Sequence, residues 1–212
     1  MTKVNSNRNT QLIEHLRKSG AIGSERITEA FIAIDRANFV LPEYIPEAYQ
    51  DYPLPIGHAA TISQPTTVAF MLELLEPRND QKILDVGAGS GWTTALLAHI
   101  TGKNGRVYGI EIIPELAEFG GANLAKYALP QATIETAGPA YGLPEHALFD
   151  RILVSATADE LPDTLIDQLA PNGRMVIPLK DSIWLITKNA NGTISKKEYP
   201  GFIFVPLQHP KK

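Results

Sequence analysis

The stretch Lys82-Ile83-Leu84-Asp85-Val86-Gly87-Ala88-Gly89-Ser90-Gly91-Trp92 decides the fold. Its first half is largely apolar and partly β-branched, which predicts a buried strand. Glycines then occupy alternate positions, where they let the backbone turn sharply and let a ligand approach it closely. Thr93, Leu96 and Leu97 continue at helical spacing. A strand, a glycine turn and a helix start together predict a cradle for a nucleotide.

Glu111 supports this interpretation. It ends a second apolar strand, Arg106–Ile110, and lies twenty residues past Gly91. An acidic side chain in that position accepts hydrogen bonds from both hydroxyls of a nucleotide ribose.

Composition limits the classes of function. The chain has 212 residues, no cysteine and a net charge of −4. The length suits one domain, and the charge does not suggest nucleic acid or an anionic membrane as a partner. The missing cysteines exclude disulfides and thiol chemistry and fit a cytoplasmic location. No apolar run approaches the roughly 18–20 residues that span a bilayer. We expect no metal site, because metal-ligand spacing is absent among His15, His58, His99, His146 and His209.

The first third of the chain is expected to be helical with one long loop. Apolar spacing predicts helices over Gln11–Ser19, capped by Asn9 or Thr10, and after Ser24, which can cap the second. Prolines between Asn38 and Gly57 block a regular helix, so this segment either covers the core or lines a substrate groove.

A second helix start lies at Thr61-Ile62-Ser63-Gln64-Pro65. Proline suits the first helical turn, with Ser63 or Gln64 as the cap. Thr61 and Ser63 are therefore candidates for capping, worth about 1 kcal/mol, or for catalysis.

Strands and helices alternate after the glycine turn, which predicts a mainly parallel sheet with helices on both faces. Two glycines in the helix from Pro114 to about Tyr127 weaken it, and a close contact there would explain them. An antiparallel hairpin closes the chain, and together with the D-x-G-x-G-x-G spacing it favours an S-adenosylmethionine-dependent methyltransferase over a dinucleotide dehydrogenase. The later expected elements are strands at Ile134, Asp150–Ser155, Arg174–Pro178, Ser182–Thr187 and Tyr199–Leu207, a helix over Leu161–Leu169, and turns at Pro171–Gly173 and Asn189–Gly192.

Several blocks resemble the protein-L-isoaspartate (D-aspartate) O-methyltransferase family. The most specific is the pair Pro53–Gly57 and Thr61–Pro65, because general methyltransferases lack it. The other matching blocks are Ile34–Arg36 with Phe39-Val40, Ile83–Gly91, Phe149–Ile152, Gln168–Arg174 and Phe204–Leu207.

The resemblance implies a class I methyltransferase, with a Rossmann-like, mostly parallel sheet, an N-terminal helical extension and a C-terminal hairpin. We expect one domain over 1–212, with helices and substrate loop in 1–80, the cofactor core in 81–180 and the hairpin in 181–212. The implied catalytic residues are Ser63 and Thr61, and the implied cofactor-binding residues are Asp85, Gly87, Ala88, Gly89, Glu111, Ile112 and Gly138.

The implied reaction moves a methyl group from S-adenosylmethionine to the stray carboxylate of an isoaspartyl or D-aspartyl residue in a damaged protein. The ester collapses to a succinimide, which hydrolyses partly to aspartate. No general base is needed, because a carboxyl group with a pKa of about 4 is already ionised. The site must orient the carboxylate and exclude water, and Ser63, Thr61 and the N–H groups of the next helix can donate to it. We expect a monomer acting on damaged proteins and peptides.

Two positions depart from the family pattern. The family places an adenine-contacting Asp where this chain has Gly138, so adenine recognition is expected to be weaker, or supplied by Tyr141 or backbone. The family's Gln before the Thr-Ile-Ser block is replaced in the run His58-Ala59-Ala60. A methyltransferase with another acceptor, or a non-catalytic peptide-binding relative, therefore remain alternatives.

Overall fold

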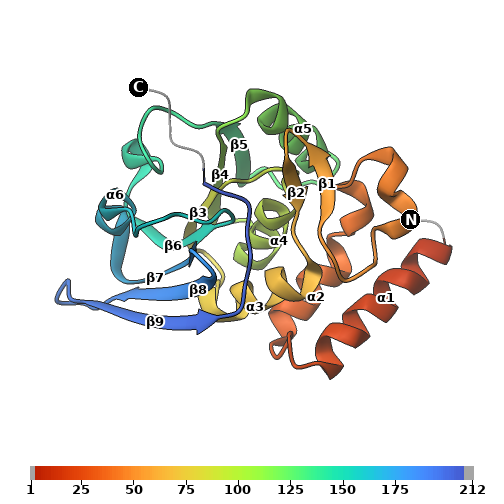
Figure 1. The fold of residues 1–212 in the computed structure, drawn as a ribbon, viewed down its shortest axis with the longest axis horizontal. Coiled ribbons are helices and arrows are strands. Elements are labelled where there is room, and N and C mark those ends of the chain that lie inside the picture. The colour runs from red at the N-terminus through yellow and green to blue at the C-terminus, as the bar shows by residue number, and fades with distance from the viewer. Residues whose placement is uncertain (1–2, 208–212) are drawn as a thin grey trace.

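A seven-stranded sheet of order β5-β4-β3-β6-β7-β8-β9 forms the centre of the molecule (Figure 1). The structure is a computed structural model that describes residues 3–207, with side chains from residue 7. The first five strands of that order run parallel, whereas β8 is antiparallel to both of its neighbours. The expected parallel sheet with a C-terminal antiparallel hairpin is thus confirmed. The strands are β3 (Lys82–Val86), β4 (Arg106–Glu111), β5 (Ala132–Thr136), β6 (Phe149–Val154), β7 (Leu169–Leu179), β8 (Ser182–Lys188) and β9 (Ile194–Pro200).

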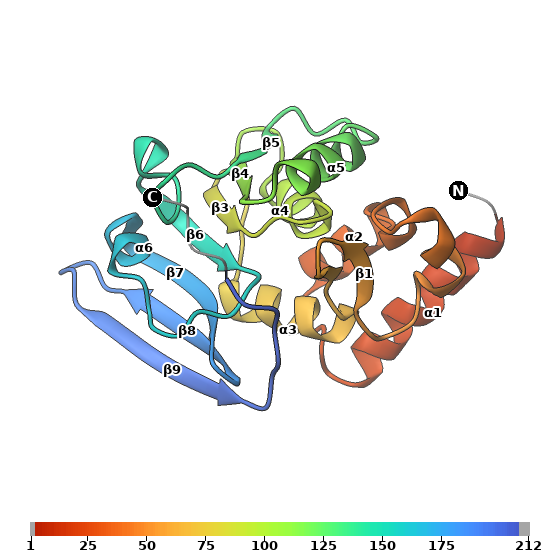
Figure 2. The ribbon, with the colours of Figure 1, turned by 45° about the horizontal axis from the view of Figure 1, so that its top comes forward.

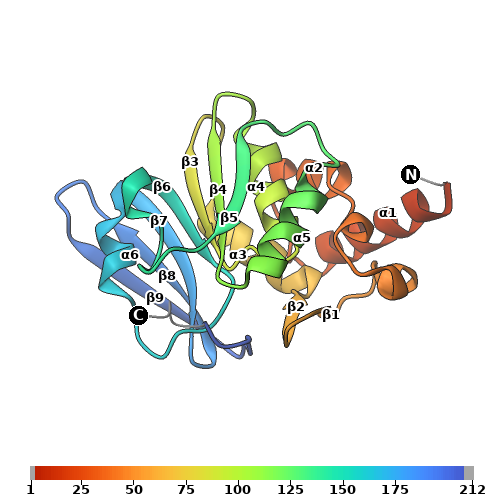
Figure 3. The same cartoon turned by 90° about the horizontal axis from the view of Figure 1, so that it is seen from above.

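Helices cover the two faces of the sheet unequally. Strand side chains alternate between two apolar clusters: Ile83 packs with the N-terminal helices, and Leu84 packs on the opposite face with α6 and the loop before β6. Figures 2 and 3 show α4 and α5 beside the sheet and α1 and α2 beyond them. The helices are α1 (Lys3–Lys18), α2 (Glu25–Ala33), α3 (Pro65–Leu75), α4 (Trp92–Thr101), α5 (Pro114–Leu124) and α6 (Asp163–Asp167), with short 3-10 turns η1 (Arg36–Asn38), η2 (Pro42–Glu47) and η3 (Pro144–His146).

The first two helices differ from the prediction at their amino ends. α1 begins at Lys3, so Asn9 lies inside it, and Asn9 Nδ2 donates to Phe31 O at 3.1 Å instead of capping. Ser24 does precede α2, but its hydroxyl donates to Glu73 Oε1 at 2.9 Å and caps nothing. Tertiary partners outcompete the local caps at both positions.

The last third of the chain shifts two predicted boundaries. The expected turn Pro171–Gly173 lies inside β7, where Asn172 adopts a φ of 63° and the pairing with β6 is irregular. The last strand is Ile194–Pro200, not Tyr199–Leu207, because the tight turn pairs Lys188 directly with Ile194. Residues 201–207 leave the sheet, and Leu207 N donates to Thr157 O at 2.7 Å.

The glycine turn touches α5 through its backbone. A Cβ at Gly120 would lie 2.6 Å from Gly89 O and 3.3 Å from Gly91 N, whereas a Cβ at Gly121 would meet nothing within 4 Å. Of the two helical glycines, Gly120 is therefore the one that allows the expected close contact.

We predict opposite effects for alanine at these neighbouring positions. Gly120→Ala should lower the free energy of unfolding by about 1–3 kcal/mol, because the added methyl group overpacks the contact. Gly121→Ala should raise it by up to about 1 kcal/mol, because alanine favours a helix. Denaturant unfolding of both variants measures the difference, and equal stability of the two would contradict the contact.

Candidate functional site

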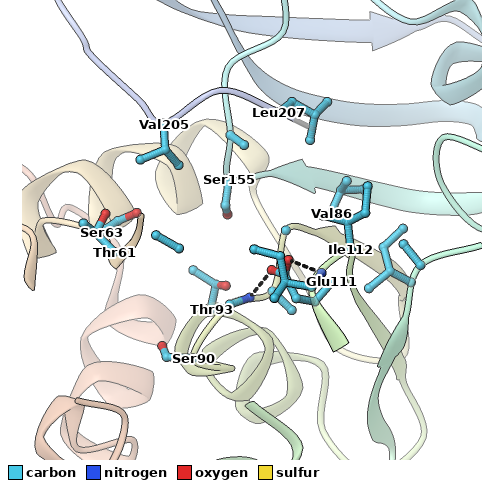
Figure 4. Close-up of a pocket in the computed structure, with 18 of the residues that line it drawn as sticks. Thr61, Ser63, Val86, Ser90, Thr93, Glu111, Ile112, Ser155, Val205 and Leu207 are labelled. Atoms are coloured by element: carbon cyan, nitrogen blue, oxygen red, sulfur yellow. Dashed lines mark hydrogen bonds between the residues drawn. The ribbon is translucent and has the colours of Figure 1, made fainter. Parts of the chain in front are cut away.

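A cavity opens at the carboxyl ends of the parallel strands, where open α/β sheets bind ligands. Hydroxyls, one carboxylate and apolar side chains line it (Figure 4). Its wall includes the glycine turn 87–90, Glu111 at the end of β4 with the next two residues, Ala137 and Ala140–Gly142 after β5, Ser155 and Ala156 after β6, Thr61–Ser63, and Val205–Leu207.

Glu111 is fixed in this wall by backbone donors. Its side chain is 7% exposed; Gly89 N donates to Oε2 at 2.9 Å and Ile113 N donates to Oε1 at 3.1 Å. A carboxylate offers about four acceptor sites, so two remain for a ligand. Positive φ angles at Gly87 and Gly89, 79° and 50°, bring bare backbone to the same place. The arrangement suits a ribose whose two hydroxyls bind Glu111 and whose ring lies close to the main chain.

Asp85 lies behind the glycine turn and does not line the cavity. It is fully buried, and its Oδ2 accepts from Thr93 Oγ1 at 2.7 Å and Thr94 Oγ1 at 2.6 Å. Burial raises the pKa of Asp85 to about 6, against the lowering effect of the two threonine hydroxyls. Within the described part of the chain its Oδ1 has no hydrogen-bond partner. A buried acceptor left open there is compatible with a cationic ligand group nearby.

Thr61 and Ser63 stand together at the other end of the cavity from Glu111 (Figure 4). Thr61 lies in β2 (Ala60–Ile62), which forms a small hairpin with β1 (Leu54–Gly57), and Ser63 directly follows β2. Both side chains are half-buried, and neither hydroxyl donates to or accepts from another described residue. These two hydroxyls are therefore available to a ligand.

Arg36 holds the backbone that carries Ser63. Arg36 is 1% exposed, and its Nη2 donates to Ser63 O at 3.1 Å and to Tyr52 O at 3.0 Å. Burial lowers the pKa of Arg36 to about 10, with Asp51 acting in the opposite sense. The group stays charged at neutral pH.

Asp51 caps α3, which corrects the expected role of Ser63 or Gln64. Thr66 N donates to Asp51 Oδ1 at 2.9 Å and Thr66 Oγ1 donates to Oδ2 at 2.6 Å. Gln64 occupies the N-cap position without a side-chain cap bond. Since Pro65 has no N–H and the N–H of Thr66 is taken, neither of the first two helical residues offers a free N–H to a bound carboxylate.

The remaining predicted positions divide into two groups. Ala88 and Ile112 line the cavity together with the glycine turn, whereas Gly138 is exposed and outside the lining. Tyr141, Ala140 and Ala137 form the wall on that side. Gln168 secures this wall, because its Oε1 accepts from Leu143 N at 2.7 Å and its Nε2 donates to Tyr141 O at 2.9 Å.

Sequence reasoning missed the roles of Arg36, Asp51 and Gln168. Each acts through backbone atoms distant along the chain, and no local pattern signals such contacts. His58 also lines the cavity, at the tip of the β1–β2 hairpin, where its φ is 52°.

No group of three or more His, Asp or Glu residues within 3–207 could hold a metal ion, and His209 lies outside the described residues. In the same range no helix combines the length and apolar character needed to cross a membrane.

The mostly parallel sheet, the glycine turn and the acid at the end of β4 define a class I S-adenosylmethionine-dependent methyltransferase. The family model described as "Protein-L-isoaspartate(D-aspartate) O-methyltransferase (PCMT)" matches residues 7–212. The chain belongs to that family.

Proteins that are similar to this chain over most of its length carry the name of that family. A protein-L-isoaspartate O-methyltransferase of Aeropyrum pernix is 45% identical over 202 residues, covering 93% of this chain and 78% of the relative. One from Methanopyrus kandleri is 43% identical over 202 residues, covering 93% and 89%. A Plasmodium falciparum structure assigned to the same activity, in complex with S-adenosyl-L-homocysteine, superposes with a TM-score of 0.84 at 29% identity, covering 93% and 97%.

We predict that burial of the Asp85 carboxylate makes the free energy of unfolding depend on pH. Because its pKa in the folded protein exceeds the unfolded value, stability should fall as pH rises from about 4 to about 6, where the folded protein must bury the charge. A shift of about two units corresponds to about 3 kcal/mol. Relative to Asp85→Asn, the wild type should therefore lose about that much unfolding free energy over this window.

Denaturant unfolding at several pH values measures the effect, with Asp181→Asn, at an exposed position, as the control for loss of one carboxylate. A pH-independent difference between the wild type and Asp85→Asn would contradict the buried charge.

Proposed function

We propose that this chain repairs damaged proteins by moving a methyl group from S-adenosylmethionine to the free carboxylate of isoaspartyl or D-aspartyl residues. The observation that carries the proposal is that one cavity has the Glu111 carboxylate at one end and the Thr61 and Ser63 hydroxyls at the other. Membership of the family supports the substrate class.

The cofactor half of the cavity would be formed by the glycine turn and the residues after β4. Glu111 would accept hydrogen bonds from the ribose hydroxyls with its remaining lone pairs. Gly87, Ala88 and Gly89 would let the methionine portion lie against the backbone, and Asp85 would hold that turn through Thr93 and Thr94. Ile112 would pack against the base, whereas Gly138 lies outside the cavity wall, so its share in binding would be indirect.

The acceptor half would be formed by Thr61 and Ser63. Each hydroxyl can donate one hydrogen bond to the acceptor carboxylate, and a bond to a charged group contributes about 1.5–3 kcal/mol. The carbonyl of Ser63 is fixed by Arg36, so the hydroxyl is presented on a restrained backbone. Positioning of this kind is the main catalytic requirement, because an ionised carboxylate needs no base.

S-adenosylmethionine supplies an activated methyl group on its sulfonium when bound. Val205 and Leu207 close the cavity from the C-terminal side and help to exclude water from it. Domain organisation, oligomeric state and location are also proposed: one methyltransferase domain over 1–212, a monomer, and a cytoplasmic site of action that suits a chain without cysteine.

We predict methylation of an isoaspartyl peptide but not of its aspartyl counterpart. Purified protein, incubated with radiolabelled S-adenosylmethionine and either peptide, should label the isoaspartyl peptide alone. An equal signal from both peptides would favour a methyltransferase with another acceptor. Cofactor binding by calorimetry without any peptide labelling would also overturn the proposed acceptor.

We predict that Ser63→Ala lowers kcat/KM for the isoaspartyl peptide about 10–100-fold, through loss of a hydrogen bond to a charged group. The Kd for S-adenosylhomocysteine should stay unchanged, because Ser63 lies at the opposite end of the cavity from Glu111. Ser195→Ala, at an exposed position on β9, is the matched control. Undiminished turnover by Ser63→Ala would remove this serine from the mechanism.

A further inference from the structure

The chain contains three Asn-Gly pairs: Asn104–Gly105, Asn172–Gly173 and Asn191–Gly192. Such pairs are chemically labile. The glycine nitrogen attacks the asparagine Cγ, the N–Cγ bond forms, and Nδ2 leaves as ammonia with the proton of the backbone N–H. Water then opens the succinimide at either carbonyl and gives aspartate or isoaspartate. Glycine permits the reaction because it adds no side chain and bends freely.

Two of the three pairs are locked by packing around the glycine. Gly105 is buried, and a Cβ there would lie 2.5 Å from Thr101 Cβ. Gly173 is also buried, inside β7, and a Cβ there would lie 2.7 Å from Ala170 O. The backbone rotation that closes a five-membered ring would displace packed atoms at both places.

The third pair is exposed in the turn between β8 and β9. Asn191 and Gly192 are both exposed, and a Cβ at Gly192 would meet nothing within 4 Å. Among the residues that the structure describes, one backbone hydrogen bond restrains the attacking nitrogen, from Gly192 N to Asn189 O at 2.9 Å. That bond lies at a hairpin tip, where local opening has a low cost.

The asparagine side chain is also polarised for attack. Asn191 Oδ1 accepts from Thr193 N at 3.1 Å and from Thr193 Oγ1 at 2.7 Å. Asn189 Nδ2 in turn donates to Thr193 Oγ1 at 2.8 Å, which fixes the hydroxyl. Two donors aimed at one carbonyl oxygen stabilise the negative charge that develops there when a nucleophile adds.

We propose that Asn191 is the position at which this protein itself ages to isoaspartate, and that a second copy of the chain methylates the damaged residue. The second part rests on the proposed function. In that step the isoaspartyl carboxylate oxygen gains the methyl group as the bond between sulfur and methyl breaks, and the cofactor leaves as neutral S-adenosylhomocysteine.

The geometry requires a second copy. β8 starts at Ser182, beside the carboxyl end of β7, and ends at Lys188 beside the turn. Its seven residues span about 20 Å. The turn therefore lies near the amino ends of the parallel strands, whereas the cavity lies at their carboxyl ends. Figure 1 shows the loop that joins β8 and β9. Methylation should accordingly be second order in protein.

The first experiment measures where isoaspartate forms. The full-length wild type is aged at mildly alkaline pH without cofactor, and its proteolytic fragments are separated and identified by mass spectrometry. The amount of isoaspartate at position 191 should exceed that at positions 104 and 172 by about tenfold or more. The hairpin tip opens locally at a lower free energy than the two packed segments do. Equal amounts at all three, or none at 191, would overturn the proposal.

The second experiment measures methyl transfer to the aged chain. Aged wild type with fresh enzyme and labelled cofactor should take up label, and aged Asn191→Gln should take up about tenfold less, since glutamine cyclises slowly and the tip is the most open site. Asn104→Gln and Asn172→Gln are matched controls that should label like the wild type. Label unchanged by Asn191→Gln would overturn the proposal.

An isoaspartyl peptide in a parallel tube separates the two possible failures. If the peptide is not labelled, the proposed function fails. If the peptide is labelled but chains with isoaspartate at 191 are not, the methyl-transfer part of this inference fails while the proposed function stands. Activity of each variant on the peptide also reports that it is folded.

Discussion

One buried cation holds the acceptor side of the site together. The guanidinium of Arg36 donates to five carbonyl oxygens, two within the segment Ala48–Gln50 and the others at Tyr52, Ile62 and Ser63, at 2.9–3.4 Å. It also lies 5.4 Å from the ring of Trp92 at the start of α4. A charge buried without such partners would be prohibitively costly. A single side chain therefore joins the proline-rich segment, the end of β2 with Ser63 directly after it, and the start of the helix after the glycine turn.

The cofactor side is held by close packing instead. The glycine turn lies against α5 at Gly120, where no side chain fits, and Asp85 joins the turn to α4 through two threonine hydroxyls. The Glu111 carboxylate is oriented by two backbone N–H groups. A backbone that is already ordered binds a ligand without rearrangement. The conformational entropy of ordering it is lost on folding and does not weaken binding. The two halves of the site are thus organised differently: a buried cation fixes the acceptor side, whereas close backbone packing and hydrogen bonds to two carboxylates fix the cofactor side.

Patterns with a short period predicted the fold well. Apolar strands and the glycine turn identified β3 and β4, and the Asn-Gly turn identified the final hairpin, because these signals lie within a few neighbouring residues. Contacts between distant segments could not be read in this way. Asp51, which caps α3, lies fifteen residues before its partner Thr66 in the sequence. The sequence pattern around the helix start predicted Ser63 or Gln64 as the cap instead. The last strand was misplaced because aromatic residues in 199–207 resemble a strand, whereas the hairpin turn fixes the pairing at Ile194.

Gly138 stands where the family pattern has an aspartate, so this chain has one negative charge fewer near the site. Gly138 itself is not part of the cavity wall. Glu111 is the one carboxylate among the described residues that line the cavity, and the wall beyond it is built from Ala137, Ala140 and Tyr141. Gln168 holds that wall by hydrogen bonds to the backbone on either side of Gly142. Under the proposed function, binding of the base against this wall would depend on apolar surface contact, whose contribution is proportional to the area buried. Under the proposed function, an anionic acceptor would consequently meet one fewer negative charge near this cavity than the family pattern would place there.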